Sequence, residues 1–232
     1  MAALIETLID KVDNVELIRD QIAAIILVEQ ARQQELAAAA DPPKDPKLWR
    51  LRVFLERANP WDEFPSDPQD GVAFDAAPLV NVWWANSDDG EHGSNTVERQ
   101  RVTATFHIDC YGYGVSRETE AGHDSGDETA ALEAQRAARL VRNILMSAHY
   151  TYLGMRGVVA KRWRASAQAF QPAIDSRPVA HVSAVRQSFQ VTFNEFSPQH
   201  VPVPLALISV AVKRIDTGEL LFTADYPQEI DS

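Results

Sequence analysis

The sequence predicts an α+β fold: a mainly antiparallel β-sheet with helices packed on one face, followed by a C-terminal β-hairpin arm. Two observations predict the sheet and its helices. Segments 97–113 and 180–196 alternate apolar and polar residues, and two capped segments carry an apolar stripe with helical spacing. A third, the proline-rich stretch 197–204 ahead of two short alternating segments, predicts the arm. The expected organisation is N-terminal helices over 1–40, a core domain over 41–197 with a long loop at 59–78, and a proline-stalked hairpin over 198–232.

Two helices are expected at the N-terminus. The first, over 2–12, has an apolar face of Leu4, Ile5, Leu8, Ile9 and Val12. Asp13 with Glu16 three residues later has the capping-box spacing that begins a second helix. The core stripe of that helix is Ile18, Ile22, Ile25 and Ile26. Beyond Glu29 the stripe fades into polar residues and alanines, so we expect the helix to extend past its own domain, where a partner covers its end.

A break, a short strand and a long loop follow. Prolines in 41–46 end the helix, and the next segment alternates apolar with charged residues as a half-buried strand does: Trp49, Leu51, Val53 and Leu55. The loop from Asn59 to Pro78 contains Trp61, Phe64 and Phe74, side chains poorly suited to a loop that faces only water. Trp61 and Phe64 are therefore predicted to contact another subunit.

Two strands are expected at 78–86 and 97–113, with a polar hairpin loop between them at 87–96. In the longer strand one face is formed by Val102, Ala104, Phe106, Ile108 and Cys110, and the other by Thr103, Thr105, His107, Asp109 and Tyr111. Gly112, Gly114 and Gly122 are interpreted as a turn signal where this strand ends.

A second capping-box pair, Ser125 and Glu128, begins a helix that is expected to reach about Tyr150. Its alanine-rich face, which favours close packing on a sheet, is Ala130, Ala134, Ala137, Val141, Ile144, Leu145 and Ala148. Beside that face, Arg136, Arg139 and Arg142 form either a basic stripe that meets an acidic neighbouring subunit or a solvated helix face. Strands are expected at 156–165 and 180–196, the second with Val185, Phe189, Val191 and Phe193 facing inward.

The C-terminal arm is predicted from Ile208, Val210 and Val212, a turn at Asp216 to Gly218, and a return strand from Leu220 to Asp225. A two-stranded hairpin is marginally stable alone, so we expect it to pack on another subunit. The interface candidates are Leu205, Ile208, Val210, Val212, Leu220 and Phe222.

Composition and charge limit the function classes. Apolar residues make up 45% of the chain, but the longest apolar run, 22–28, is too short to cross a membrane. A single cysteine, Cys110, and an N-terminus without a secretory signal indicate synthesis in the cytoplasm. The net charge of −11 repels phosphate backbones and argues against a sequence-reading DNA binder. Lys161, Arg162 and Arg164 are a local exception: they contact phosphate, with Trp163 stacking on a base, or they form ion pairs and guard a strand edge.

The residues that could carry chemistry do not form a catalytic pattern. Alternation places Cys110 on the strand face opposite His107 and Asp109, so these three cannot converge on a metal. Four possible metal ligands lie close together at the start of a helix: His123, Asp124, Asp127 and Glu128. A capped helix N-terminus enriched in acids, which the helix dipole favours, explains them equally well. No phosphate-binding loop, zinc-finger spacing or nucleophile elbow is found in the sequence. We therefore expect no catalytic site, metal or cofactor; a nucleic-acid-processing or metal-dependent enzyme is the alternative from another class.

Several whole segments resemble neck and tail-completion proteins of tailed bacteriophages and prophages. They are residues 14–29, 48–61, 97–114, 131–146, 193–198 and 212–226. The resemblance implies helices packed on one antiparallel sheet and subunits assembled as rings, often hexamers, that cap the tail tube and meet the head connector. It also implies tail tube, sheath or connector proteins as partners, a place in the virion after assembly in the host cytoplasm, and DNA that passes without specific binding. A head-completion or adaptor protein of the connector is the alternative within the virion.

Overall fold

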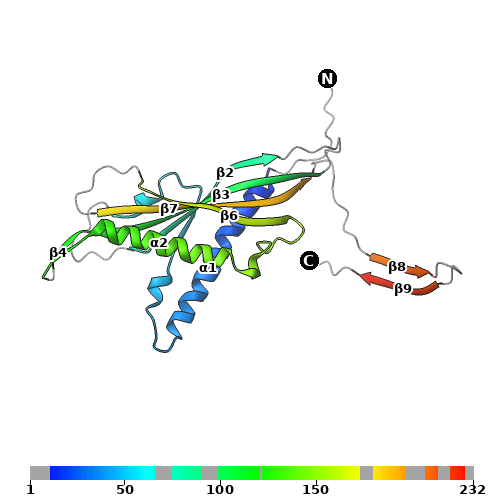
Figure 1. Ribbon diagram of the computed structural model, residues 1–232, viewed down its shortest axis with the longest axis horizontal. Helices are drawn as coiled ribbons and strands as arrows, with labels where there is room; N and C mark the ends of the chain where they lie inside the picture. The colour runs from blue at the N-terminus through cyan, green and yellow to red at the C-terminus, as the bar shows by residue number, and fades with distance from the viewer. Residues whose placement is uncertain are drawn as a thin grey trace, which may run out of the picture. The chain divides into compact units, whose positions relative to one another are not determined.

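A computed structural model describes residues 11–65, 75–89, 99–120, 122–172, 180–196, 207–213 and 220–227 (Figure 1). The chain divides between Ser197 and Pro198 into two compact units. Residues 8–197 form one unit, and the other contains the strands β8 (Leu207–Lys213) and β9 (Leu220–Pro227). The helix expected at 2–12 falls almost wholly outside the described residues.

The larger unit is built on a five-stranded sheet in the order β1-β2-β3-β7-β6. Its strands are β1 (Arg52–Leu55), β2 (Leu79–Asp89), β3 (Arg99–Val115), β6 (Val159–Phe170) and β7 (Ala180–Phe196). All neighbours pair antiparallel except β1 and β2, which are parallel. The predicted α+β class is therefore confirmed. The strand expected from Trp49 begins later, because Trp49 closes a 3₁₀ helix, η1 (Pro46–Trp49).

Two helices, α1 (Asn14–Ala38) and α2 (Gly126–Leu145), lie on the same side of this sheet (Figure 1). The isoleucine stripe of α1 and the apolar face of β3 are buried in one shared core, as the two periodicities predicted. The Asp13 carboxylate accepts a hydrogen bond from the Glu16 amide at 2.9 Å, so half of the first capping box is present. At α2 the Ser125 side chain instead donates to Asp127, and the helix ends before Ala148, which is exposed in η3 (Ala148–Tyr150).

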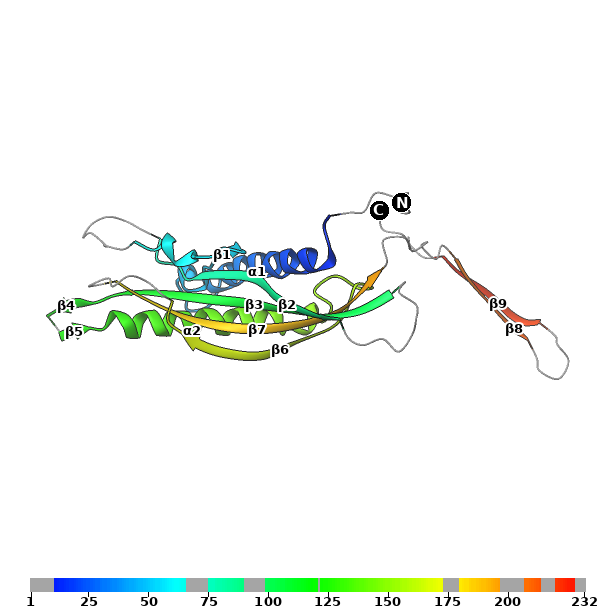
Figure 2. The same cartoon turned by 90° about the horizontal axis from the view of Figure 1, so that it is seen from above.

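Gly112 and Gly114 do not form a turn; both lie inside β3, directly beneath α2. A Cβ atom on Gly112 would lie 2.1 Å from the Ala130 carbonyl oxygen, and one on Gly114 would lie 2.0 Å from the Gly126 carbonyl oxygen. The backbone of α2 therefore rests on the backbone of β3, which requires glycine at both positions. Beyond this contact, the short ladder of β4 (Arg117–Thr119) and β5 (Gly122–Asp124) connects β3 to the start of α2 (Figure 2).

The opposite face of the sheet carries a second, smaller apolar cluster. Part of the long loop lies in it: after η2 (Pro60–Glu63), Phe64 is only 2% exposed and its ring stacks on that of Tyr113 at 4.9 Å. Trp61 lies 5.5 Å from the ring of Tyr111. Phe64 is therefore covered within its own chain, which corrects its interpretation as a contact with another subunit, and Trp61 also packs against the sheet; Phe74 lies outside the described residues.

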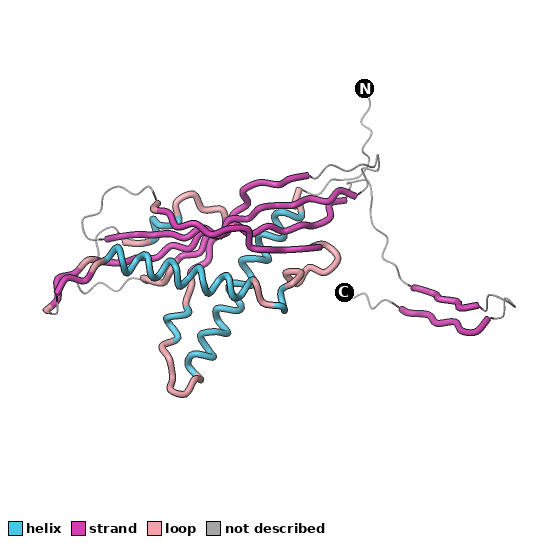
Figure 3. The backbone as a smooth tube through the Cα atoms, viewed as in Figure 1, coloured by secondary structure: helices cyan, strands magenta, loops and turns pink. Residues whose placement is uncertain are grey.

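The C-terminal half of α1 extends away from the sheet, and the connection through η1 returns beside it (Figure 3). The Lys44 amide bonds the Ala37 carbonyl at 3.0 Å, and the Gln30 side chain accepts from the Leu51 amide at 2.9 Å. Val28 is nevertheless 66% exposed and Leu48 70% exposed. Large apolar side chains thus remain in contact with solvent at this end of the unit.

Candidate functional site

A groove between η1 and α2 combines exposed apolar and basic side chains. We call it the α2 groove and define it by Leu48, Leu51, Arg136, Ala137, Arg139 and Leu140. Its volume is about 400 Å³. Leu51 and Ala137 form a buried floor, whereas Leu48 stands at the rim. The groove can therefore take a segment that offers both an apolar side chain and a negative charge.

The three arginines of α2 do not form one stripe. Three residues advance an α-helix by about 300°, so each step moves the side chain about 60° around the axis. Arg136 and Arg139 border the α2 groove, and Arg142 does not. The Arg136 guanidinium, 67% exposed, pairs with Glu133 at 2.6 Å, while Arg142 donates to the Asn143 side chain at 3.1 Å. The predicted basic surface is thus reduced to two side chains.

A polar cluster lies on the other face of the sheet, beside a cavity of about 370 Å³. Its centre is Asp109, whose side chain is 2% exposed and accepts hydrogen bonds from Arg186 at 2.7 and 2.8 Å. The Trp83 indole N–H donates to the same carboxylate at 3.0 Å, and the Tyr111 hydroxyl at 3.3 Å. The Arg186 guanidinium lies between two rings, 4.9 Å from the centroids of both Trp83 and Phe170.

This cluster is a buried ion pair whose carboxylate accepts four hydrogen bonds. Four donors surround Asp109, so its charge is compensated where it stands. Burial, followed by the Asp109 carboxylate, raises the pKa of Tyr111 and keeps that hydroxyl a neutral donor. Sequence reasoning missed the pair, although Asp109 and Arg186 occupy directly opposite positions of β3 and β7. Opposite charges at facing positions of two strands are the signal that could have found it.

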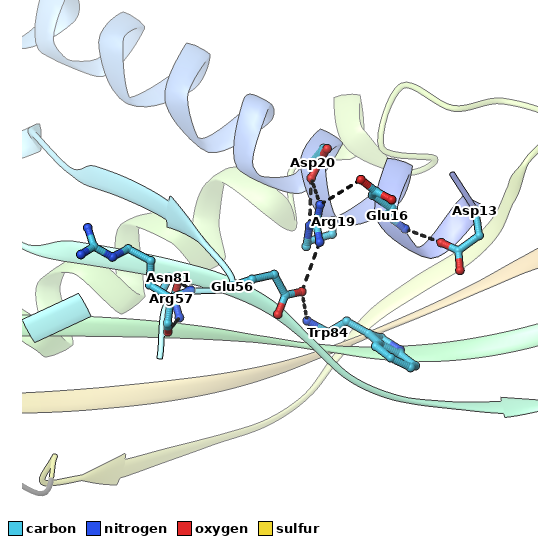
Figure 4. A network of polar contacts seen from close by, with 8 residues as sticks. All are labelled: Asp13, Glu16, Arg19, Asp20, Glu56, Arg57, Asn81 and Trp84. Atoms are coloured by element: carbon cyan, nitrogen blue, oxygen red, sulfur yellow. Dashed lines mark hydrogen bonds and ion pairs between the residues drawn. The ribbon is translucent and has the colours of Figure 1, made fainter. Parts of the chain in front are cut away.

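A second polar network joins α1 to the sheet (Figure 4). The Glu56 carboxylate, just after β1, accepts from Arg19 of α1 at 3.4 Å and from the Trp84 amide of β2 at 3.0 Å. Next to it, the Asn81 side chain bonds both the amide and the carbonyl of Arg57, at 3.1 and 2.9 Å. These contacts hold the end of β1 in register with β2 and stabilise a parallel strand of only four residues.

The basic run on β6 is largely used inside the chain. Arg162 donates to the carbonyls of Tyr150 and Ser147, the latter at 2.7 Å, where the chain leaves α2. Arg164 donates to the Gln187 side chain at 2.9 Å. Lys161 alone of the three is exposed, and its ammonium lies 4.7 Å from the ring centroid of Trp163. The three cations therefore do not present a joint phosphate-binding surface.

The side chains considered for metal binding lie apart. Cys110 is fully buried among the core residues beneath the helices, as alternation predicted, while Asp109 faces the other way. Burial raises the pKa of the Cys110 thiol far above its ordinary value. His123 pairs with Glu118 at 2.9 Å, and Asp127 accepts from Ser125 and from the Glu128 amide. Among the residues that the structure describes, no group of three or more His, Cys, Asp or Glu side chains is placed to hold a metal.

The C-terminal strands pair as an antiparallel hairpin, as the alternation predicted. The register places Ile208 opposite Tyr226, Val210 opposite Ala224 and Val212 opposite Phe222, with Leu220 opposite Lys213. Leu205 and the turn at Asp216 to Gly218 lie outside the described residues. Three predicted apolar positions of β8 thus lie opposite Tyr226, Ala224 and Phe222 of β9, whereas Leu220 lies opposite a lysine.

No protein-family model matches the sequence, and no curated protein sequence matches it significantly. Within the described part of the chain, neither helix is long and apolar enough to span a membrane.

Proposed function

We propose that the chain is a structural subunit of the neck or tail end of a tailed bacteriophage. In this proposal identical copies form a ring that terminates the tail tube, joins it to the head connector and lines the DNA passage. The subunit acts by assembly, without a catalytic site, metal or cofactor. Its partners are further copies of itself and the tail tube, sheath or connector proteins of the virion.

The observation that carries the proposal is the division of the chain into a helix-covered sheet and a separate two-stranded unit. A ladder of only two strands is marginally stable in water unless something covers it. In a ring each subunit contacts two neighbours, so a segment donated by one copy is covered by the next. The resemblance of six segments to neck and tail-completion proteins supports the same assignment.

The charge of the chain also supports it. A net charge of −11 gives an average surface that repels a phosphate backbone. A channel wall of this kind lets DNA slide without holding it. The same charge is unsuited to a protein that must grip DNA.

The mass of the purified full-length chain in solution tests this proposal. Native mass spectrometry and light scattering are expected to find closed oligomers of one defined copy number, alone or with tail tube protein. Deleting residues 205–232 is expected to leave a folded, soluble chain that no longer assembles. A full-length chain that stays monomeric both alone and with tail tube protein would falsify the proposal.

A further inference from the structure

The α2 groove combines an apolar floor with basic side chains at its rim. Its floor is apolar, Leu48 at its rim is 70% exposed, and about 400 Å³ of space lies between η1 and α2. Removing an exposed leucine side chain from water is favourable, so an occupant that covers Leu48 gains binding free energy. Exposed large apolar side chains next to a concavity are typical of interaction sites.

The charge at the rim limits what the occupant can be. Arg136 and Arg139 face the groove, and Glu133 is the acid beside them. Because Glu133 compensates only one of the two cations, the rim keeps a net positive charge. An acidic segment with apolar side chains therefore matches the groove in charge and in polarity.

The C-terminal segment of this chain has that composition. After Arg214 the sequence contains no Lys or Arg, whereas it contains five acids, Asp216, Glu219, Asp225, Glu229 and Asp231. Leucine, phenylalanine, tyrosine and isoleucine are interleaved with them. The other acidic segment with aromatics, the loop that begins at Asn59, is a poorer match because its Phe64 is already buried against the sheet of its own copy.

We propose that the α2 groove binds the acidic C-terminal segment, residues 215–231, of a second copy of this chain. The inference rests on the proposed ring and names the contact between neighbouring subunits. Each copy donates its segment to the next and receives one from the previous copy, which closes a ring when the rotation between subunits allows it. Arg136 and Arg139 pair with carboxylates of the segment, and Leu48 packs on its apolar side chains.

Disulfide trapping between two differently tagged, co-expressed full-length chains tests the contact. One chain carries Leu48→Cys and the other Glu229→Cys; the native Cys110 is fully buried and stays silent. A disulfide-linked heterodimer is expected. The matched control replaces Leu48→Cys by Val28→Cys, an equally exposed apolar position on α1, and is expected to link at a yield several-fold lower.

Charge reversal provides the second readout. Arg136→Glu with Arg139→Glu is expected to weaken self-association roughly tenfold or more, because two attractive contacts become repulsive. Arg32→Glu, an exposed arginine of α1, is the matched control and should leave association unchanged.

The outcomes separate this inference from the proposed function. Oligomers of normal mass that give equal linkage at Leu48→Cys and Val28→Cys overturn the groove contact and leave the ring standing. A Leu48→Cys/Glu229→Cys chain that closes the disulfide only within itself also overturns it. A full-length chain that stays monomeric, both alone and with tail tube protein, overturns the ring and the groove contact together.

Discussion

Arg186 on β7 holds the carboxylate of Asp109 on β3 in a bidentate pair, with Nε 2.7 Å from Oδ1 and Nη2 2.8 Å from Oδ2. The two residues face each other across the ladder, and the arginine lies between the rings of Trp83 and Phe170. One pair therefore fixes two central strands and two aromatic side chains on the face that the helices leave uncovered.

Removing the arginine is expected to destabilise the chain. Arg186→Met should lower the free energy of unfolding by about 2–4 kcal/mol, because it leaves the nearly buried Asp109 charge without its main partner. Urea denaturation measures the loss. Arg32→Met at an exposed site should cost almost nothing. The double variant Asp109→Asn/Arg186→Met should lose less than the sum of the single variants, and additive losses would show that the two residues do not act as a pair.

His107 is expected to make stability depend on pH. Burial, and then the positive charge of Arg186, lower the pKa of this imidazole from its ordinary value near 6.5. The folded chain therefore favours neutral His107. The contribution of neutral His107 to the free energy of unfolding is complete above about pH 6.5, and it is lost as the pH falls toward the lowered pKa of the folded chain. His107→Gln should flatten the fall in urea midpoint between pH 7.5 and pH 5, and an unchanged slope would contradict the assignment.

The contact of α2 with β3 predicts that neither glycine beneath it can be enlarged. Gly112→Ala should destabilise the chain by about 1–3 kcal/mol, because the new Cβ would lie 2.1 Å from the Ala130 carbonyl oxygen and 2.4 Å from the Ala134 amide nitrogen. Thermal denaturation measures the effect. Gln100→Ala, at an exposed position of the same strand, is the control and should stay close to the parent chain.

Local periodicity predicted whether the longer segments form helices or strands, and in several of them which face is buried. The isoleucine stripe of α1 and the alternation around Cys110 follow from the helical and strand repeats alone, and the bounds of β7 coincide with the predicted 180–196. Which strands pair with one another was harder to predict from the sequence. The parallel pairing of β1 with β2 is accompanied by contacts such as that of the Asn81 side chain with the backbone of Arg57, which lies 24 residues away in the sequence.

The turn interpretation of Gly112 and Gly114 was wrong, and the role of Arg162 stayed open, for a related reason. Gly112 has no special backbone angle, so its role is visible only once α2 is known to lie on it. Arg162 was left open between a phosphate contact and an ion pair at a strand edge. Its hydrogen bonds at the end of α2 depend on the fold bringing Ser147 and Tyr150 beside β6. A residue type indicates which interactions are available, and the tertiary structure decides which are made.

The Cys110 thiol is expected to be unreactive in the folded chain. Its side chain is fully buried and its thiol pKa is raised by that burial, so the reactive thiolate is scarce. A water-soluble thiol reagent should label the denatured chain stoichiometrically and the native chain hardly at all. Cys110→Ala should cost only about 1–2 kcal/mol and leave the metal content of the purified protein unchanged at zero. Stoichiometric zinc or iron that is lost on Cys110→Ser would contradict this.

The surroundings of the basic run on β6 determine how DNA binding should be tested. Alanine at Arg162 removes hydrogen bonds to two backbone carbonyls and is expected to destabilise the fold by about 1–3 kcal/mol. A loss of binding in that variant would not identify a phosphate contact. Lys161→Ala changes an exposed side chain whose ammonium lies over the nearby Trp163 ring, so this variant isolates the electrostatic contribution to DNA binding.

We expect the full-length chain to bind duplex DNA weakly and without sequence preference. Its net charge is −11, and of the three cations on β6 only Lys161 is exposed. A single phosphate contact corresponds to a slope of about −0.9 in the logarithm of affinity against the logarithm of salt concentration, which is shallow for a DNA-binding protein. A titration of labelled duplex at two salt concentrations measures this slope, and Lys161→Ala should reduce it toward zero while leaving the fold intact. Tight binding that persists at physiological salt and distinguishes between sequences would overturn this prediction, and with it the proposal that the ring guides DNA without gripping it.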